Sequence, residues 1–132
     1  MSFCHQQTIT DKAFENLKGI HTLKMGCCNQ QTITDRAFEN LKGIHTLDMK
    51  SCNQETITDK AFKHLKGIHT LNISNINSII DKTFEQLEGI SSLDISCCNQ
   101  NTITNKIFEH LKDIKYSIWN YALKQQSPKM LC

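Results

Sequence analysis

The stretch LKGIHTLDMKSCNQETITDKAF, residues 41–62, decides the fold because its pattern recurs along the whole chain. Phenylalanines at one slot of the pattern are 24, 24, 22 and 24 residues apart, at Phe14, Phe38, Phe62, Phe84 and Phe108. One unit is therefore two residues short, and five units nearly fill the 132-residue chain. A fixed period of this length indicates a repeat protein built as one array.

The first half of the stretch predicts a short strand. Leu47 and Met49 alternate with polar residues from Thr46 to Lys50. Alternation with a period of two gives a strand one buried face and one outward face. The polar residues 53–56 that follow turn the chain away from the strand.

The second half predicts a helix about two turns long. Thr58 or Asp59 can cap it, and Ala61, Phe62 and Leu65 share its inward side. The helix ends at a glycine, the residue best suited to a left-handed backbone, at Gly19, Gly43, Gly67 and Gly89. Neither strand nor helix can bury its apolar side alone, so the units are expected to stack strand on strand and helix on helix.

Residues 41–62 resemble the cysteine-containing subtype of the leucine-rich repeat, an LxxLxLxxC segment followed by Ile-Thr-Asp. The resemblance implies an α/β solenoid: a leucine-rich-repeat arc with a parallel sheet on the concave face, short helices on the convex face and about five repeats of 24 residues. The whole chain, 1–132, is then a single domain. It divides into a partial N-terminal repeat at 1–20, full repeats at 21–114, and a C-terminal cap and tail at 115–132.

The same resemblance bears on function. This subtype is familiar from F-box/LRR proteins, the substrate-binding subunits of ubiquitin ligases. The high content of Ile, Lys and Asn resembles the composition of repeat proteins of large DNA viruses that infect amoebae. It implies a protein–protein interaction module, a scaffold or adaptor that recruits a host protein or a ligase substrate. No segment upstream of the repeats is expected to form an F-box. The alternative is a self-associating structural repeat protein with no separate ligand.

Composition narrows the partners and the location. The formal net charge is only +2, and 14 of the 15 basic residues are lysines, so that only Arg36 offers a bidentate fork for phosphate or guanine. We therefore expect a protein partner and no nucleic acid. No apolar run approaches the roughly 20 residues of a membrane-spanning helix, so we expect no membrane contact and a cytoplasmic location, in the host cytoplasm if the protein is viral.

Most of the seven cysteines fall at one slot of the repeat. Cys4, Cys28, Cys52 and Cys98 share that slot with Ile76, which indicates an apolar core position. Cys27 and Cys97 precede it by one residue and should be partly exposed; three strand spacings, about 14 Å, keep them too far apart for a bridge. We expect reduced thiols, with disulfides or a metal as the alternatives.

The outward strand positions form columns that are candidates for partner binding. One column barely changes between repeats, whereas the central column varies in charge, as a recognition surface would; the alternative is a solvated sheet face. No Trp, Tyr or Arg, the usual interface anchors, occurs among them. The candidate residues are Thr22, Lys24, Thr46, Asp48, Lys50, Thr70, Asn72, Ser74, Ser92, Asp94 and Ser96.

The two ends of the array carry separate expectations. Ile9, Phe14 and Leu17 have a stacked neighbour on one side only, which predicts self-association as a homodimer through the N-terminal end. At the other end, Tyr116, Trp119 and Tyr121 predict a terminal cap, with a docking patch as the alternative.

His21, His45 and His69 form a column with about 4.8 Å between neighbours, close enough for two imidazoles to share a metal. However, copying of one repeat explains the column, and Ser91 ends it. We therefore expect no metal site and no cofactor. Catalysis is not expected either, because every candidate nucleophile or base is duplicated along the repeats instead of lying at a unique site.

Overall fold

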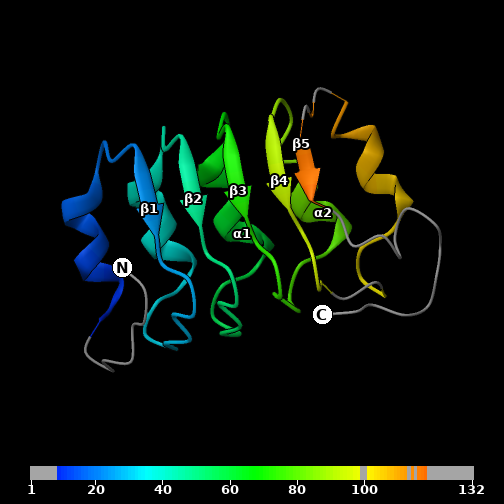
Figure 1. The fold of residues 1–132 in the computed structure, drawn as a ribbon. Coiled ribbons are helices and arrows are strands. Elements are labelled where there is room, and N and C mark those ends of the chain that lie inside the picture. Colours follow the sequence, from blue (N-terminus) through cyan, green and yellow to red (C-terminus); the bar gives the residue numbers. More distant parts are fainter. Residues whose placement is uncertain (1–8, 99–100, 113, 115, 119–132) are drawn as a thin grey trace.

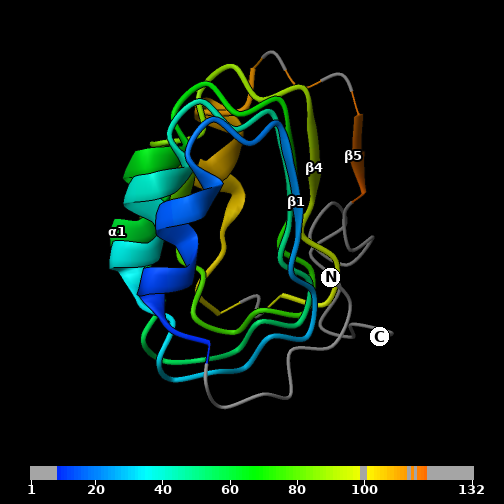
Figure 2. The same cartoon turned by 90° about the vertical axis from the view of Figure 1, so that its left-hand side faces the viewer.

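Repeated strand–turn–helix units stack side by side in the computed structural model, which describes residues 9–98, 101–112, 114 and 116–118. Strands form one layer and short helices form the other, and each unit crosses from one layer to the next and back (Figure 1). Seen from the N-terminal end, along the stack, the successive units nearly overlap (Figure 2). The α/β solenoid predicted from the sequence is confirmed.

The described strands are three residues each and all run parallel. They form a five-stranded sheet in sequence order, β1 to β5. Matching residues of successive repeats pair directly, so that Thr46 lies beside Thr70 and Leu47 beside Leu71. The strands are β1 Thr22–Lys24, β2 Thr46–Asp48, β3 Thr70–Asn72, β4 Ser92–Asp94 and β5 Tyr116–Ile118.

The helices of the second layer are mostly 3-10 helices. Their α-helical parts are shorter than the two turns that the sequence predicts. A segment this short completes few α-helical hydrogen bonds, and 3-10 geometry is common in short pieces. Only the two four-residue segments labelled α are α-helical within the described chain. The elements are η1 Asp11–Leu17, η2 Asp35–Leu41, α1 Asp59–Phe62, η3 Lys63–Leu65, α2 Asp81–Phe84 and η4 Asn105–Glu109.

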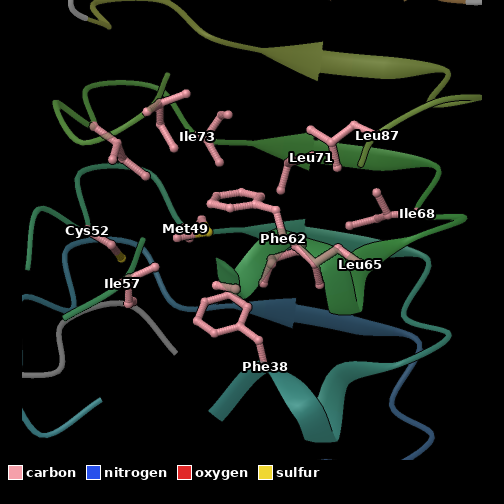
Figure 3. Packing of buried hydrophobic residues seen from close by; sticks show 14 of the residues in the cluster. Phe38, Met49, Cys52, Ile57, Phe62, Leu65, Ile68, Leu71, Ile73 and Leu87 are labelled. Carbon is pink, nitrogen blue, oxygen red and sulfur yellow. The ribbon is translucent and has the colours of Figure 1, made fainter. Parts of the chain in front are cut away.

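The core lies between the two layers and consists of apolar columns, one residue per repeat. Leu47, Met49 and Phe62 are all 0% exposed, and Figure 3 shows Phe62 between Leu71 and the ring of Phe38 in the preceding repeat. Phe108 departs from its column with 37% exposure, while Ile107 is buried. Ile107 occupies the slot of Ala61, which is also 0% exposed.

Two turns with a left-handed backbone recur in the described repeats, at four positions each. The predicted helix-ending turn is confirmed, with φ of 79° to 86° at Gly19, Gly43, Gly67 and Gly89. The second turn follows each strand and was not predicted, because its residues are not glycines. They are Cys27, Ser51, Asn75 and Cys97, with φ of 57° to 63°.

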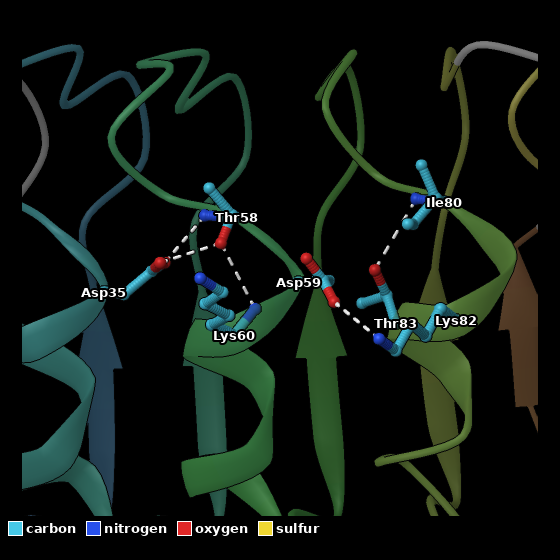
Figure 4. Close-up of polar contacts among 7 residues, drawn as sticks. All are labelled: Asp35, Thr58, Asp59, Lys60, Ile80, Lys82 and Thr83. Atoms are coloured by element: carbon cyan, nitrogen blue, oxygen red, sulfur yellow. Dashed lines mark hydrogen bonds and ion pairs between the residues drawn. The ribbon is translucent and has the colours of Figure 1, made fainter.

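Within the described residues, a carboxylate ladder links the starts of η2, α1 and η4 to the preceding repeat. Thr58 donates from its backbone N–H and its hydroxyl to the two oxygens of Asp35, at 2.7 Å each (Figure 4). Its Oγ1 also accepts from the Lys60 N–H at 3.3 Å, which confirms Thr58 as the helix cap. The same double contact joins Thr34 to Asp11 and Thr104 to Asp81.

The ladder breaks at Ile80, which replaces the threonine in the shortened repeat. Asp59 receives no hydrogen bond from this position and makes a 3.9 Å ion pair with Lys82, whose side chain is 67% exposed. The Ile80 N–H turns to the Thr83 hydroxyl at 3.5 Å (Figure 4). An exposed ion pair of this length contributes little.

Restoring the ladder should therefore stabilise the chain. We expect Ile80→Thr to raise the free energy of unfolding by about 1 kcal/mol, because it adds two hydrogen bonds to Asp59 and a helix cap. Thr58→Ile, the reverse change in a regular repeat, should lower it by about 1–3 kcal/mol. Urea unfolding of both variants measures the difference, and a loss of stability in Ile80→Thr would contradict the role assigned to the ladder.

Candidate partner-binding face

The outward side chains of β1–β4 and of the turns after them form one continuous surface, here called the strand face. Thr22, Lys24 and Lys50 are exposed, and Ser74 is buried, with 4% exposure. Direct pairing of the strands brings the predicted columns together as expected. The remaining candidate residues are half-buried: Thr46, Asp48, Thr70, Asn72, Ser92, Asp94 and Ser96.

The central column also holds the turns that follow the strands. Oδ1 of Asp48 accepts from the Lys50 N–H at 3.1 Å. Oδ1 of Asn72 accepts from both the N–H and the hydroxyl of Ser74, at 3.0 and 2.7 Å. Asp94 and Ser96 repeat this contact at 2.9 and 2.7 Å. The column predicted for recognition thus has a structural role as well.

These contacts fix the orientation of two carboxylates on the strand face. Within the described residues, Oδ2 of Asp48 and Oδ2 of Asp94 accept no hydrogen bond. Each aspartate therefore holds the backbone with one oxygen and keeps the other available. Lys24 cannot accept a hydrogen bond, and Gly26 stands at the matching turn position of the first strand.

The histidine column lies beside the threonine column of the strand face. The rings of His21 and His45, and those of His45 and His69, stack with centroids 4.5 Å apart. Sequence reasoning placed these rings but missed the Thr hydroxyl beside each one, although the His-Thr dipeptide at 21–22, 45–46 and 69–70 signals it. No cluster of three or more His, Cys, Asp or Glu side chains in the described residues is arranged to hold a metal.

The cysteines follow the slot assignment, with one correction. Cys28, Cys52 and Cys98 are buried, and Cys27 is half-buried. Burial raises the pKa of the Cys98 thiol to about 11, and its Sγ donates to the Ile73 carbonyl at 3.2 Å. Cys97 is disulfide-bonded, so the expectation that all seven cysteines are reduced is wrong for this residue.

The labelling rates of the thiols should reflect this burial. In the native chain we expect Cys27 to react with a maleimide reagent much faster than Cys28, Cys52 or Cys98, because only its side chain reaches solvent. Mass spectrometry of peptides after timed labelling measures the rates. Equal rates at all four thiols, with unfolding excluded by circular dichroism, would contradict the register.

An apolar cavity of about 220 Å³ lies at the N-terminal end of the described residues. The three residues predicted for self-association all line it: Ile9 and Leu17 are half-buried, and Phe14 is buried, with 5% exposure. At the other end, Tyr116 belongs to β5, which pairs with β4. Trp119 and Tyr121 of the predicted cap lie outside the described residues.

Comparisons with known proteins agree with this architecture. Residues 4–115 match the family model of the BspA type leucine rich repeat region, in six copies. The comparison with curated proteins returned no match. None of the helices in the described part of the chain has the length and apolar character that crossing a bilayer requires.

Two solved structures share the fold at low sequence identity. One is the TLR13–ssRNA13 complex, with a TM-score of 0.65 and 20% identity over 98% of this chain and 20% of that chain. The other is the Toll–Spatzle complex of Drosophila, with a TM-score of 0.62 and 14% identity over 80% of this chain and 14% of that chain. This chain therefore spans no more than a fifth of either, and the likeness shows the fold alone.

Proposed function

Because this chain belongs to the BspA-type leucine-rich repeat family, we propose that it is a protein-binding module whose strand face holds a partner protein. Leucine-rich repeats generally mediate protein–protein interaction, and solenoids present an extended face for it. The observation that carries the proposal is the orientation of Asp48 and Asp94. Both carboxylates are held by turn hydrogen bonds and keep one oxygen for a partner.

Such fixed side chains suit binding because little freedom is lost when a partner arrives. The repeat frame supplies the backbone, and the charge varies along it, from Lys24 through Asp48 and Asn72 to Asp94. A partner that matches this order presents an acidic group opposite β1 and basic groups opposite β2 and β4. Charge complementarity of this kind selects between partners.

The experiment neutralises the two carboxylates without disturbing the turns. Asn72 already makes the same turn contact with a neutral side chain, so the double variant Asp48→Asn, Asp94→Asn should fold normally. We expect its partner to bind about tenfold or more weakly, the equivalent of about 1.4 kcal/mol. Affinity capture from the natural host cell, read by quantitative mass spectrometry, compares it with the wild-type chain.

A matched control changes the same charge on the helix side. Glu39 and Glu85 are both exposed, and Glu39→Gln with Glu85→Gln should retain the partner like the wild-type chain. Equal retention by all three chains would refute the strand face as the binding site. Dominant capture of RNA by the wild-type chain would refute a protein partner.

The narrower resemblance extends the proposal to recruitment. Similarity to the cysteine-containing repeats of F-box/LRR proteins favours a partner that is itself to be recruited, a ligase substrate or, if the chain is viral, a host protein in the cytoplasm. Ubiquitin-ligase subunits captured together with the partner would support this extension. Their absence from a capture that retains the partner would refute it.

Self-association is the second candidate, favoured by the apolar cavity at the N-terminal end. A second copy that covers Ile9, Phe14 and Leu17 would bury this surface in a two-fold contact. We expect Ile9→Lys to shift the chain toward monomer, because it places a charge in the apolar contact. Sedimentation equilibrium across a wide concentration range measures the shift, with Ile80→Lys, at another partly exposed isoleucine, as the control. A wild-type chain that stays monomeric throughout would rule out the dimer.

A further inference from the structure

The histidine column has a geometry that repetition of the sequence alone does not require. Its three imidazoles are nearly parallel, with interplanar angles of 14° and 12° and centroid spacings of 4.5 Å. His21 and His69 are exposed, and His45 is half-buried between them. The rings therefore form one row at the edge of the strand face.

Each ring also has a hydrogen-bond partner of the same kind, the threonine that follows it. Nδ1 of His21, His45 and His69 lies 3.1 Å from the hydroxyl of the threonine that follows it. When Nδ1 carries the proton, it donates to this oxygen and leaves a lone pair on Nε2. Histidines that bind metals are held in this way, with one ring nitrogen donating to an oxygen and the other coordinating the ion. Within the described residues, no hydrogen bond engages Nε2 of these rings.

We propose that His45, together with His21 or His69, binds one transition-metal ion through Nε2 at the edge of the strand face. The ion belongs to the class that imidazole favours, Zn²⁺, Ni²⁺ or Cu²⁺, and not to the oxygen-binding class of Mg²⁺ and Ca²⁺. Water fills the remaining coordination positions. Two imidazoles are fewer than the three or more ligands of a built metal centre, so the site is an open one on the surface.

The stacking distance is compatible with such a pair. Two nitrogens bound tetrahedrally at 2.0–2.1 Å from one zinc lie roughly 3.3 Å apart. Neighbouring rings at 4.5 Å must tilt toward each other to reach this separation, and the exposed outer ring, His21 or His69, can rotate toward His45.

A bound ion would tie β1 to β2, or β2 to β3, and would stabilise the folded chain. It would also add positive charge beside the threonine column. The metal site uses other residues than the proposed partner-binding site, which consists of the carboxylates of Asp48 and Asp94. An ion at the histidine column would nevertheless change the charge that a partner meets on the strand face.

The test uses the untagged chain in a Cys27→Ser background, so that the half-buried thiol cannot bind the metal. Isothermal titration with ZnCl₂ should show one ion per chain, and MgCl₂ should show no binding. His45→Gln should abolish zinc binding, because it removes both possible pairs. His21→Gln and His69→Gln should each retain binding through the other pair, and the double variant should lose it.

Two controls separate coordination from folding. His64→Gln removes an imidazole on the helix side and should bind zinc like the parent chain. Thr46→Val should weaken binding about 10–100-fold by removing the oxygen that orients His45, while thermal melts without metal confirm that each variant folds. Zinc binding by His45→Gln equal to that of the parent chain, or no binding by the parent chain, would overturn the proposal.

Discussion

Register between neighbouring repeats is the constraint on which the rest of the structure depends. A three-residue strand and a helical segment of at most seven residues cannot bury their apolar sides alone, so each repeat is stable only against the next. Backbone hydrogen bonds also join each repeat to the next. The Met49 N–H donates to the Asn72 carbonyl at 2.9 Å, and the Met25 N–H donates to the Asp48 carbonyl at 2.7 Å. A shift by one residue would turn Leu47 outward and separate these pairs.

Side chains reinforce the register where repeats agree and lose contacts where they differ. Asp35 holds Thr58 with both carboxylate oxygens, whereas Asp59 meets Ile80 and forms only a long ion pair. The repeat that precedes the shortened one also buries a polar side chain. Gln54 is 1% exposed, and its side-chain nitrogen and oxygen have no hydrogen-bond partner among the described residues. A buried polar group in this state costs about 1–3 kcal/mol, which the regular stack around it offsets.

Repetition made the layers, the strand pairing and the core slots predictable, because five aligned copies show which positions tolerate only apolar residues. Cys52 and Ile76 at one slot sufficed to place both in the core. Contacts between repeats were not predictable in the same way. Capping rules consider only the local chain, so they predict Asp59 as an alternative cap, whereas its counterpart Asp35 accepts hydrogen bonds from the next repeat. Likewise, the turn role of Asn72 and the left-handed backbone of Ser51 depend on three-dimensional geometry that neither residue type signals.

Scalar couplings across hydrogen bonds test the register most directly, because each one identifies the donor nitrogen and the acceptor carbonyl of a single bond. The structure predicts couplings from the Met25, Met49 and Ile73 amides to the carbonyls of Asp48, Asn72 and Asp94, respectively. Observation of all three in a uniformly ¹⁵N,¹³C-labelled chain is the expected result. Couplings to carbonyls two residues away on the neighbouring strands, in a folded chain, would contradict the stacking described above.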